Sequence, residues 1–192
     1  AKFAEHLRAG KRARDWKCKS KVRLLDADAM DSFQDLIDYD QIICAFNRTR
    51  LSINAAVREG LGRGELPEPE DRVMCLKNAR WLGLFNGMQG TIDRIWTLGG
   101  GEAYKIDFLS DGKVYRACAL ASAFDGGDRI NRVGKGVLPF DYAWAVTAHK
   151  FQGDEADRVL VLEERCGAWS HARWAYTAAS RARERLDWIC AD

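Results

Sequence analysis

The residues best suited to chemistry lie in one run, 141–162, which reads D-Y-A-W-A-V-T-A-H-K-F-Q-G-D-E-A-D-R-V-L-V-L. Its apolar part predicts a buried strand that ends in Thr147, His149 and Lys150. A hydroxyl, an imidazole and an ammonium would then lie at the carboxyl edge of a sheet, where open α/β sheets bind their ligands. All three groups suit phosphate oxygens, so they could hold a nucleic-acid backbone without reading its sequence.

The next residues of the same run suit a nucleotide better than a strand. Gly153 permits a close backbone approach or a positive φ. Glu155 is predicted to project near the nucleotide. Taken alone, a strand end of the form T-x-H-K also fits an ordinary structural strand.

A second run, 174–186, reads W-A-Y-T-A-A-S-R-A-R-E-R-L and predicts a helix that carries Arg181. A planar, permanently charged guanidinium held on a rigid helix can neutralise charge that grows on a γ-phosphate during phosphoryl transfer. An arginine near a helix end is also commonly a solvated surface residue, and the run alone does not separate the two interpretations.

The elements that must position these residues have α/β character. The apolar run 41–46 is typical of a strand buried on both faces. Asn47 interrupts it, and Thr49 is predicted to cap a helix that continues to about Leu61. Further predicted elements are a helix at 29–39, strands at 142–147, 158–162 and 186–190, and a helix at 170–183.

An all-β stretch interrupts this pattern. Residues 62–70 form a turn-rich linker with two of the three prolines. Predicted strands follow at 72–77, 91–98, 103–109 and 113–119, and then a glycine-rich loop at 125–136. They suit a small SH3-like or OB-like barrel. The predicted organisation is 1–66 (with 1–20 as a basic leading segment) and 137–192 as two parts of an α/β domain, and 67–136 as the inserted barrel.

Composition bounds the remaining possibilities. The 192 residues carry a net charge of +2, so nucleic-acid contact must depend on local placement of charge, for example in the basic stretch 8–23. That stretch could also be an ordinary solvated surface. No stretch approaches eighteen apolar residues, which favours a cytoplasmic protein without a membrane partner. The six cysteines form no C-x-x-C pair, which favours reduced thiols and no metal site.

Together the motifs resemble a known family. T-A-H-K-F-Q-G-D-E-A-D-R-V looks like motif V of superfamily 1 helicases, and Y-T-A-A-S-R-A-R-E looks like motif VI. D-Y-A-W-A-V is similar to the RecD and phage Dda branch, which includes the exodeoxyribonuclease V α subunit. R-V-M-C-L-K-N and L-F-N-G-M-Q-G-T-I resemble the SH3-like module inserted in that branch. The resemblance spans about residues 71–186.

The resemblance implies a motor of two RecA-like lobes with ATP between them, of which this chain is the C-terminal one. It implies that Arg181 is the arginine finger, that Gly153 and Glu155 face the nucleotide, and that Thr147, His149 and Lys150 face single-stranded DNA. Gln152, between the two groups, would couple them. ATP and Mg²⁺ would be held mainly by an N-terminal lobe, because this sequence has no G-x-x-x-x-G-K-[ST] loop.

Two places leave alternatives open. Motif IV, around C-A-F-N-R-T-R-L-S-I-N, has the expected strand-then-helix frame but lacks the tyrosine–arginine pair of UvrD-type helicases. Asn47 and Arg48 are candidate DNA contacts there, although Arg48 could instead replace the missing arginine or be solvated. Four barrel aromatics are expected mainly in the core, with Trp81 and Phe85 the better candidates for stacking on bases: Trp81, Phe85, Trp96 and Tyr104.

The sequence therefore predicts the C-terminal motor domain of an ATP-dependent 5′-to-3′ DNA helicase. We expect it to be a segment of a longer protein that cannot hydrolyse ATP alone. Its predicted partners are single-stranded DNA, the N-terminal RecA-like lobe and, in a repair or recombination assembly, nuclease-complex subunits. Two alternatives remain: a non-catalytic single-strand binding module, and an inactive helicase lobe of a nuclease complex.

Overall fold

A computed structural model describes residues 2–17, 21–26, 33–124, 126, 136–165, 167 and 170–191, with main chain only at 33 and 34. The chain forms two compact units. The first unit combines Ala1–Gly60 with Trp144–Asp192, and the second is Leu61–Ala143. These borders compare with breaks after residues 66 and 136 expected from the sequence. The residues that are not described include Cys18, Cys166, the end of the basic leading segment (18–20) and most of the loop 125–136.

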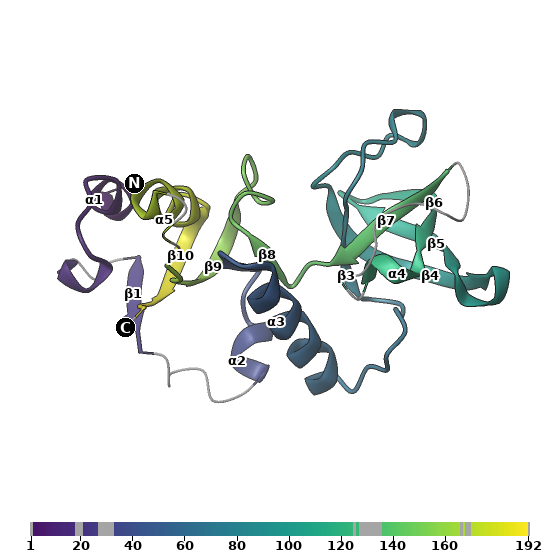
Figure 1. The fold of residues 1–192 in the computed structure, drawn as a ribbon, viewed down its shortest axis with the longest axis horizontal. Coiled ribbons are helices and arrows are strands. Elements are labelled where there is room, and N and C mark those ends of the chain that lie inside the picture. The colour runs from purple at the N-terminus through teal and green to yellow at the C-terminus, as the bar shows by residue number, and fades with distance from the viewer. Residues whose placement is uncertain are drawn as a thin grey trace. The chain divides into compact units, whose positions relative to one another are not determined.

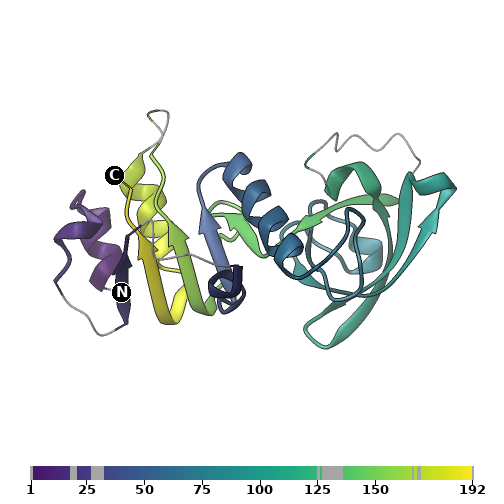
Figure 2. The same ribbon diagram turned by 90° about the horizontal axis from the view of Figure 1, so that it is seen from below.

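The first unit is built on a five-stranded parallel sheet with the order β1-β10-β9-β2-β8 (Figure 2). All-parallel sheets need crossover helices on their faces, and their strands are correspondingly apolar. β2 fits this pattern, since all four of its residues are buried. The strands are β1 (Val22–Leu25), β2 (Gln41–Cys44), β8 (Ala145–Thr147), β9 (Ala156–Leu162) and β10 (Ala182–Ile189).

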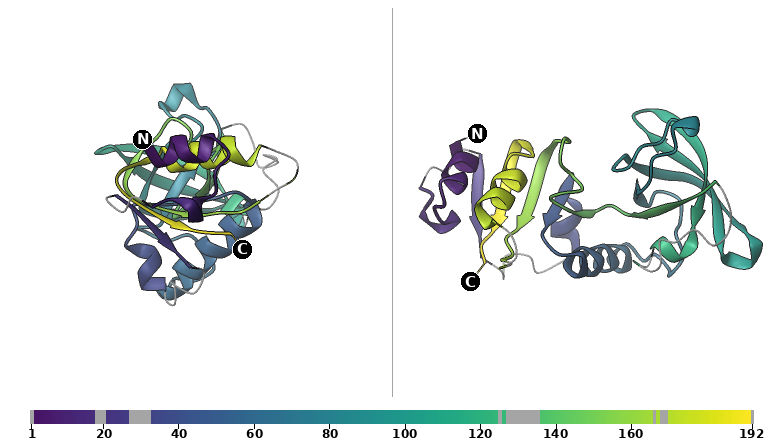
Figure 3. Two further views of the ribbon diagram at one scale, coloured as in Figure 1. Left: turned by 90° about the vertical axis from the view of Figure 1, so that its left-hand side faces the viewer. Right: turned by 45° about the horizontal axis from the view of Figure 1, so that its top comes forward.

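Helices cover both faces of this sheet (Figure 3). Helix α1 (Lys2–Arg8) packs against α5 (His171–Ala179) on one face. On the other face, α3 (Asn47–Gly60) packs on β2 and β8, with the short α2 (Phe33–Ile37) beside it. A 3-10 turn, η1 (Ala13–Asp15), follows α1. The predicted RecA-like α/β architecture is confirmed.

Strand β8, at the edge of the sheet, is fixed by one side chain of α3. Asn54 donates from Nδ2 to the carbonyl of Ala145 at 3.2 Å, and its Oδ1 accepts from the Ala145 N–H at 2.8 Å. Both residues are buried, with 1% of Asn54 and none of Ala145 exposed. The amide thus satisfies two main-chain groups that an edge strand would otherwise leave unpaired.

The second unit is a closed five-stranded barrel, β3-β4-β5-β6-β7, so the predicted inserted barrel is also confirmed (Figure 1). Gly90 is required there, because a Cβ at this position would lie 2.1 Å from the carbonyl oxygen of Leu109. The strands are β3 (Arg72–Cys75), β4 (Gln89–Leu98), β5 (Ala103–Ser110), β6 (Lys113–Leu120) and β7 (Val137–Tyr142). Short helical segments are η3 (Arg80–Leu82), η4 (Gly99–Gly101) and α4 (Ala121–Phe124).

Three local predictions are wrong. The expected strand 142–147 is two elements, because β7 pairs with β3 and β6 in the barrel whereas β8 pairs with β2 in the parallel sheet. The helix predicted to reach residue 183 ends at Ala179, and β10 begins three residues later. Thr49 does not cap α3, because the helix already begins at Asn47.

The part of the chain that the structure describes contains no helix long and apolar enough to cross a membrane. Among the same residues, no group of three or more His, Cys, Asp or Glu side chains could hold a metal ion.

Candidate functional site

The residues predicted to contact single-stranded DNA lie where the chain leaves the sheet after β8. The chain turns sharply after Thr147, whose carbonyl accepts from the N–H groups of Lys150 and Phe151 at 2.8 and 3.2 Å. The Phe151 side chain is buried and anchors this turn to the core. Thr147 is only 9% exposed, His149 is exposed and Lys150 is half-buried. The turn therefore presents His149 and Lys150 at the carboxyl edge, with Thr147 underneath.

The turn continues into the residues predicted to face a nucleotide. Gln152, Gly153 and Glu155 are all exposed. Gly153 adopts φ +105°, a conformation that L side chains rarely adopt. Of the two possibilities that the sequence left open for this glycine, a close backbone approach or a positive φ, the structure shows the positive φ. The turn then leads into β9.

Arg181 meets this turn from the other predicted motif. Its Nη1 donates to the carbonyl of Asp154 at 3.1 Å, while the Ala156 N–H donates to the Arg181 carbonyl at 3.0 Å. Its Nε donates to the carbonyl of Thr177 at 3.0 Å, and Nη2 donates to Ser180 Oγ at 2.8 Å. The guanidinium is therefore held in place, half-buried, against the carbonyl of Asp154, the residue that follows Gly153.

The prediction that Arg181 lies on a helix is wrong. It follows the last helical residue of α5 by two positions, in the turn before β10. Rigidity comes instead from the three acceptors around the guanidinium. One belongs to Thr177 in the last turn of α5, one to Ser180 just after the helix, and one to Asp154.

Glu155 also pairs with a cation. Arg183 Nε lies 3.3 Å from Glu155 Oε2, and a second arm of Arg183 lies 3.7 Å from Asp157. Both side chains of the Arg183–Glu155 pair are more than half exposed, at 58% and 52%, so water screens the interaction. The pair orients Glu155 and contributes little to stability.

Sequence reasoning missed Glu164, which joins two strand ends. Its carboxylate accepts from the N–H groups of Ala45 and Phe46 at 2.7 and 3.1 Å and from the Thr49 hydroxyl. These donors lie at the start of α3, where the helix dipole favours a negative group. An acid two residues beyond a buried strand was the available signal, and it could have placed Glu164 at the same edge as Thr147.

The candidate motif IV contacts lie beside this carboxylate. Asn47 and Arg48 begin α3 and are both exposed. The Arg48 guanidinium lies 5.2 Å from the centroid of the Phe46 ring, a cation–π distance. Both side chains therefore lie at the carboxyl edge of β2, next in the sheet to β8.

The barrel aromatics are not where most of them were expected. Trp81, Phe85 and Trp96 are 70%, 52% and 45% exposed, so the prediction that they form barrel core is wrong. Only Tyr104, at 5% exposed, belongs to that core. Trp81 lies in η3 and Phe85 follows it closely, on the segment between β3 and β4. Large exposed aromatic rings are available for contact with a ligand.

One part of the chain is similar to a known family. Residues 142–187, which include the turn, β9, α5 and Arg181, match the model of the UvrD-like helicase C-terminal domain. The matched segment is about a quarter of the chain. No curated protein matches the chain.

Solved structures of helicases share the fold of this chain. It is similar to Pif1 helicase from Bacteroides in complex with ADP-AlF3 and single-stranded DNA, with a TM-score of 0.57 and 18% identity over 100% of this chain and 50% of that one. For Pif1 helicase from Candida albicans the TM-score is 0.56 and the sequence identity 16%, over 100% of this chain and 52% of that one. For a Pif1 helicase at forked double-stranded DNA the TM-score is 0.55 and the sequence identity 18%, over 85% of this chain and 46% of that one. The chain spans about half the length of these relatives.

Proposed function

We propose that this chain is the C-terminal motor domain of an ATP-dependent 5′-to-3′ DNA helicase or translocase. The observation that carries the proposal is the hydrogen bond from Arg181 to the carbonyl of Asp154, which seats a guanidinium beside Gly153 and Glu155. A fixed, permanently charged donor next to a turn that can approach phosphates is what stabilisation of a phosphoryl-transfer transition state needs. Arg181 is therefore our candidate arginine finger.

The two parts of the segment 147–155, which runs from the carboxyl end of β8 to the amino end of β9, then have separate roles. Gln152, Gly153 and Glu155 would face ATP, while Thr147, His149 and Lys150 would hold the backbone of a single strand. Asn47 and Arg48, on the neighbouring strand end, would extend this track, and Trp81 and Phe85 of the barrel would stack on bases. The proposed domains are a RecA-like lobe formed by the two outer segments and an inserted SH3-like barrel.

The residues present fit one wall of an ATP site. This chain supplies cationic and backbone groups for the phosphates, and ATP supplies the phosphoryl group whose transfer drives movement. We propose that an N-terminal RecA-like lobe holds most of the nucleotide and the Mg²⁺. The likeness of the fold to Pif1 structures, one of which contains ADP-AlF3 and single-stranded DNA, supports this division.

The test is Arg181→Ala in the complete protein that contains this chain. We expect DNA-stimulated ATP hydrolysis to fall by about 10³–10⁵-fold, with little change in strand affinity. Arg158→Ala is the matched control, because Arg158 lies on β9 of the same unit and its guanidinium pairs with Asp40 rather than with a residue of the turn. ATP hydrolysis that stays within about tenfold of wild type after Arg181→Ala would refute the finger assignment.

The exposure of Trp81 and Phe85 favours one rival, a non-catalytic single-strand binding module. In that case the barrel would carry the affinity and the α/β unit would be scaffold. Paired substitution of Trp81 and Phe85 by Ala would then abolish binding, whereas Lys150→Ala would leave it unchanged. For the motor, Lys150→Ala should weaken strand binding and reduce its salt dependence by about one phosphate contact.

A further inference from the structure

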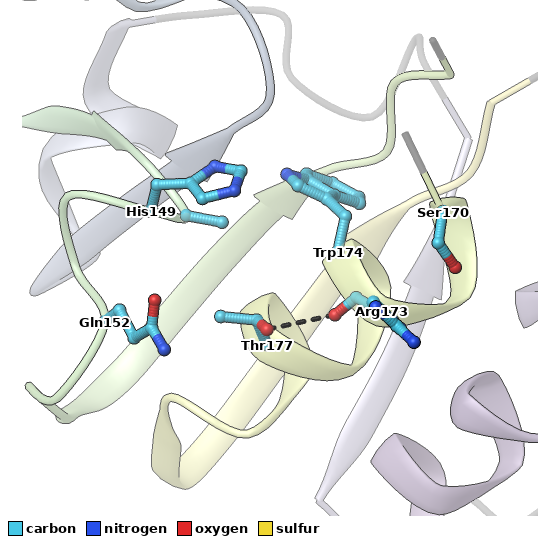
Figure 4. Close-up of a pocket in the computed structure, with 7 residues that line it drawn as sticks. His149, Gln152, Ser170, Arg173, Trp174 and Thr177 are labelled. Atoms are coloured by element: carbon cyan, nitrogen blue, oxygen red, sulfur yellow. Dashed lines mark hydrogen bonds between the residues drawn. The ribbon is translucent and has the colours of Figure 1, made fainter. Parts of the chain in front are cut away.

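A pocket of about 250 Å³ lies between the turn after β8 and helix α5 (Figure 4). It extends the proposed strand track, because His149 and Gln152 form one of its walls. The opposite wall comes from α5 and the residue before it. The lining residues are Ala148, His149, Gln152, Ser170, Arg173, Trp174 and Thr177. Its volume is below the range of about 300–1,000 Å³ typical of pockets for drug-sized ligands, so it suits a single chemical group.

Trp174 gives the pocket an unused hydrogen-bond donor. The residue is 4% exposed, and its Nε1 is buried with no hydrogen-bond partner among the residues that the structure describes. Indole N–H can only donate, and buried donors in folded proteins nearly always have an acceptor. Figure 4 shows the indole nitrogen on the side of the ring that faces His149 across the pocket.

The indole cannot easily turn away to find an acceptor elsewhere. The His171 ring stacks on it at a centroid distance of 5.8 Å, and the Trp188 ring meets it edge-on at 6.1 Å. Trp188 is fully buried and its own N–H donates to Glu163 at 3.0 Å. The N–H of the neighbouring tryptophan is thus bonded and its ring is fixed, whereas the Trp174 ring is fixed and its N–H has no acceptor within the described part of the chain.

The other lining groups define the acceptor by its charge. Arg173 is exposed and contributes a cation, and none of the lining residues carries a carboxylate. The Thr177 hydroxyl already donates to the carbonyl of Arg173 at 2.9 Å, so it presents lone pairs and no free proton. An imidazole, a guanidinium and an indole N–H around one small space favour an anionic oxygen.

We propose that this pocket binds one phosphodiester group of the single strand, with Trp174 Nε1–H donating to a non-bridging oxygen and Arg173 supplying charge. The inference rests on the proposed function, in which the same strand is held by His149, a lining residue of this pocket, and by the adjacent Lys150. Trp174 is thus a binding residue of the track, and it contacts backbone rather than bases.

The first test compares three variants of the chain in fluorescence anisotropy with an oligothymidine. Trp174→Phe keeps an aromatic ring and removes the N–H, so affinity should fall by about tenfold at an unchanged salt slope. Arg173→Gln should reduce the slope of log affinity against log salt by roughly one contact. Arg158→Gln, an exposed arginine of the same unit outside the pocket, should change neither.

The second test identifies the bound group. A series of oligothymidines is used, each with one neutral methylphosphonate linkage at a different position. At one of these positions the neutral linkage should lower the affinity of wild type but should not lower the affinity of Trp174→Phe any further. In ¹⁵N spectra, the indole signal that disappears in Trp174→Phe should shift when wild type binds the strand. This signal is read on wild-type protein, so it remains informative if the variant folds poorly.

Several results would overturn the proposal. Equal affinities for wild type and a folded Trp174→Phe would do so, as would a Trp174 indole signal that moves with inorganic phosphate but not with the oligonucleotide. Failure of the pocket is distinguishable from failure of the motor. If Arg181→Ala keeps its ATPase activity, the proposed motor function is refuted and the strand-binding measurements remain valid. If the pocket variants bind the strand as wild type does, only the proposed phosphate pocket is refuted.

Discussion

Replacing Asn54 by alanine should be the most damaging small substitution at the carboxyl edge. The change removes both partners of the Ala145 main chain, the acceptor for its N–H and the donor for its carbonyl. Neither residue has more than 1% of its surface exposed, so water does not replace the lost bonds without opening the edge of the sheet.

The magnitude follows from these two groups. A buried polar group left unsatisfied costs about 1–3 kcal/mol, so two groups cost about 2–6 kcal/mol. Stabilities of single domains are about 5–15 kcal/mol, so the loss is a large share of the total. Because β8 leads directly into the turn at 148–153, we also expect weaker single-strand binding at temperatures where the variant remains folded.

Urea unfolding followed by circular dichroism measures the change, and Ser52→Ala is the control. Ser52 lies on the same helix two residues earlier and is exposed, so its substitution should change stability by no more than about 0.5 kcal/mol. A loss below about 1 kcal/mol for Asn54→Ala, with an unchanged denaturant slope, would mean that the clamp on β8 is not a determinant of stability.

Three further predictions concern the same unit. Gly153→Ala should destabilise it by roughly 1–3 kcal/mol through backbone strain alone, because no atom lies within 4 Å of the added Cβ; unchanged urea unfolding would show that the turn relaxes. Glu164→Gln should cost about 1–3 kcal/mol by weakening the carboxylate's bonds at the start of α3, and an unchanged melting temperature at neutral pH would contradict this. Burial raises the pKa of the Cys44 thiol from 9.0 to about 12, and burial together with the hydrogen bond to a buried carboxylate raises the pKa of Tyr39 above its usual 10.0. The unfolded chain therefore loses these protons first, so the free energy of unfolding should fall as pH rises from 9 toward 12, and Cys44→Ala should flatten the first part of that fall; a flat profile for wild type would refute the assignment.

Part of the parallel sheet could be predicted because β2, β8 and the second half of β9 are apolar runs, whereas β1 and β10 contain charged residues. The run Q-I-I-C, for example, has no alternation and is buried throughout, as expected for a central parallel strand. Strand pairing was harder to predict. β7 and β8 are both apolar and are separated by two residues, so nothing in the local pattern shows that one belongs to a barrel and the other to a parallel sheet.

Residue type alone was enough to propose Arg181 and Gly153 as candidate site residues. The geometry of the site depended on contacts between distant segments, which sequence spacing does not contain. The acceptors of the Arg181 guanidinium come from residues up to 27 positions away, and the partners of Glu164 from residues up to 119 positions away. The barrel aromatics show the opposite case, since hydrophobic character predicted burial for Trp81 although that side chain is mostly exposed.

The way the barrel is inserted has a consequence for how such proteins change over evolution. The main chain leaves the first unit after Gly60 and re-enters it at Trp144. Close to both crossing points, but within the first unit, the Asn54 amide is hydrogen-bonded to the main chain of Ala145. The parallel sheet therefore keeps its edge closed by its own contacts and does not rely on what is spliced in between. Modules of different size could be exchanged at this junction while the strands of the parallel sheet keep their register.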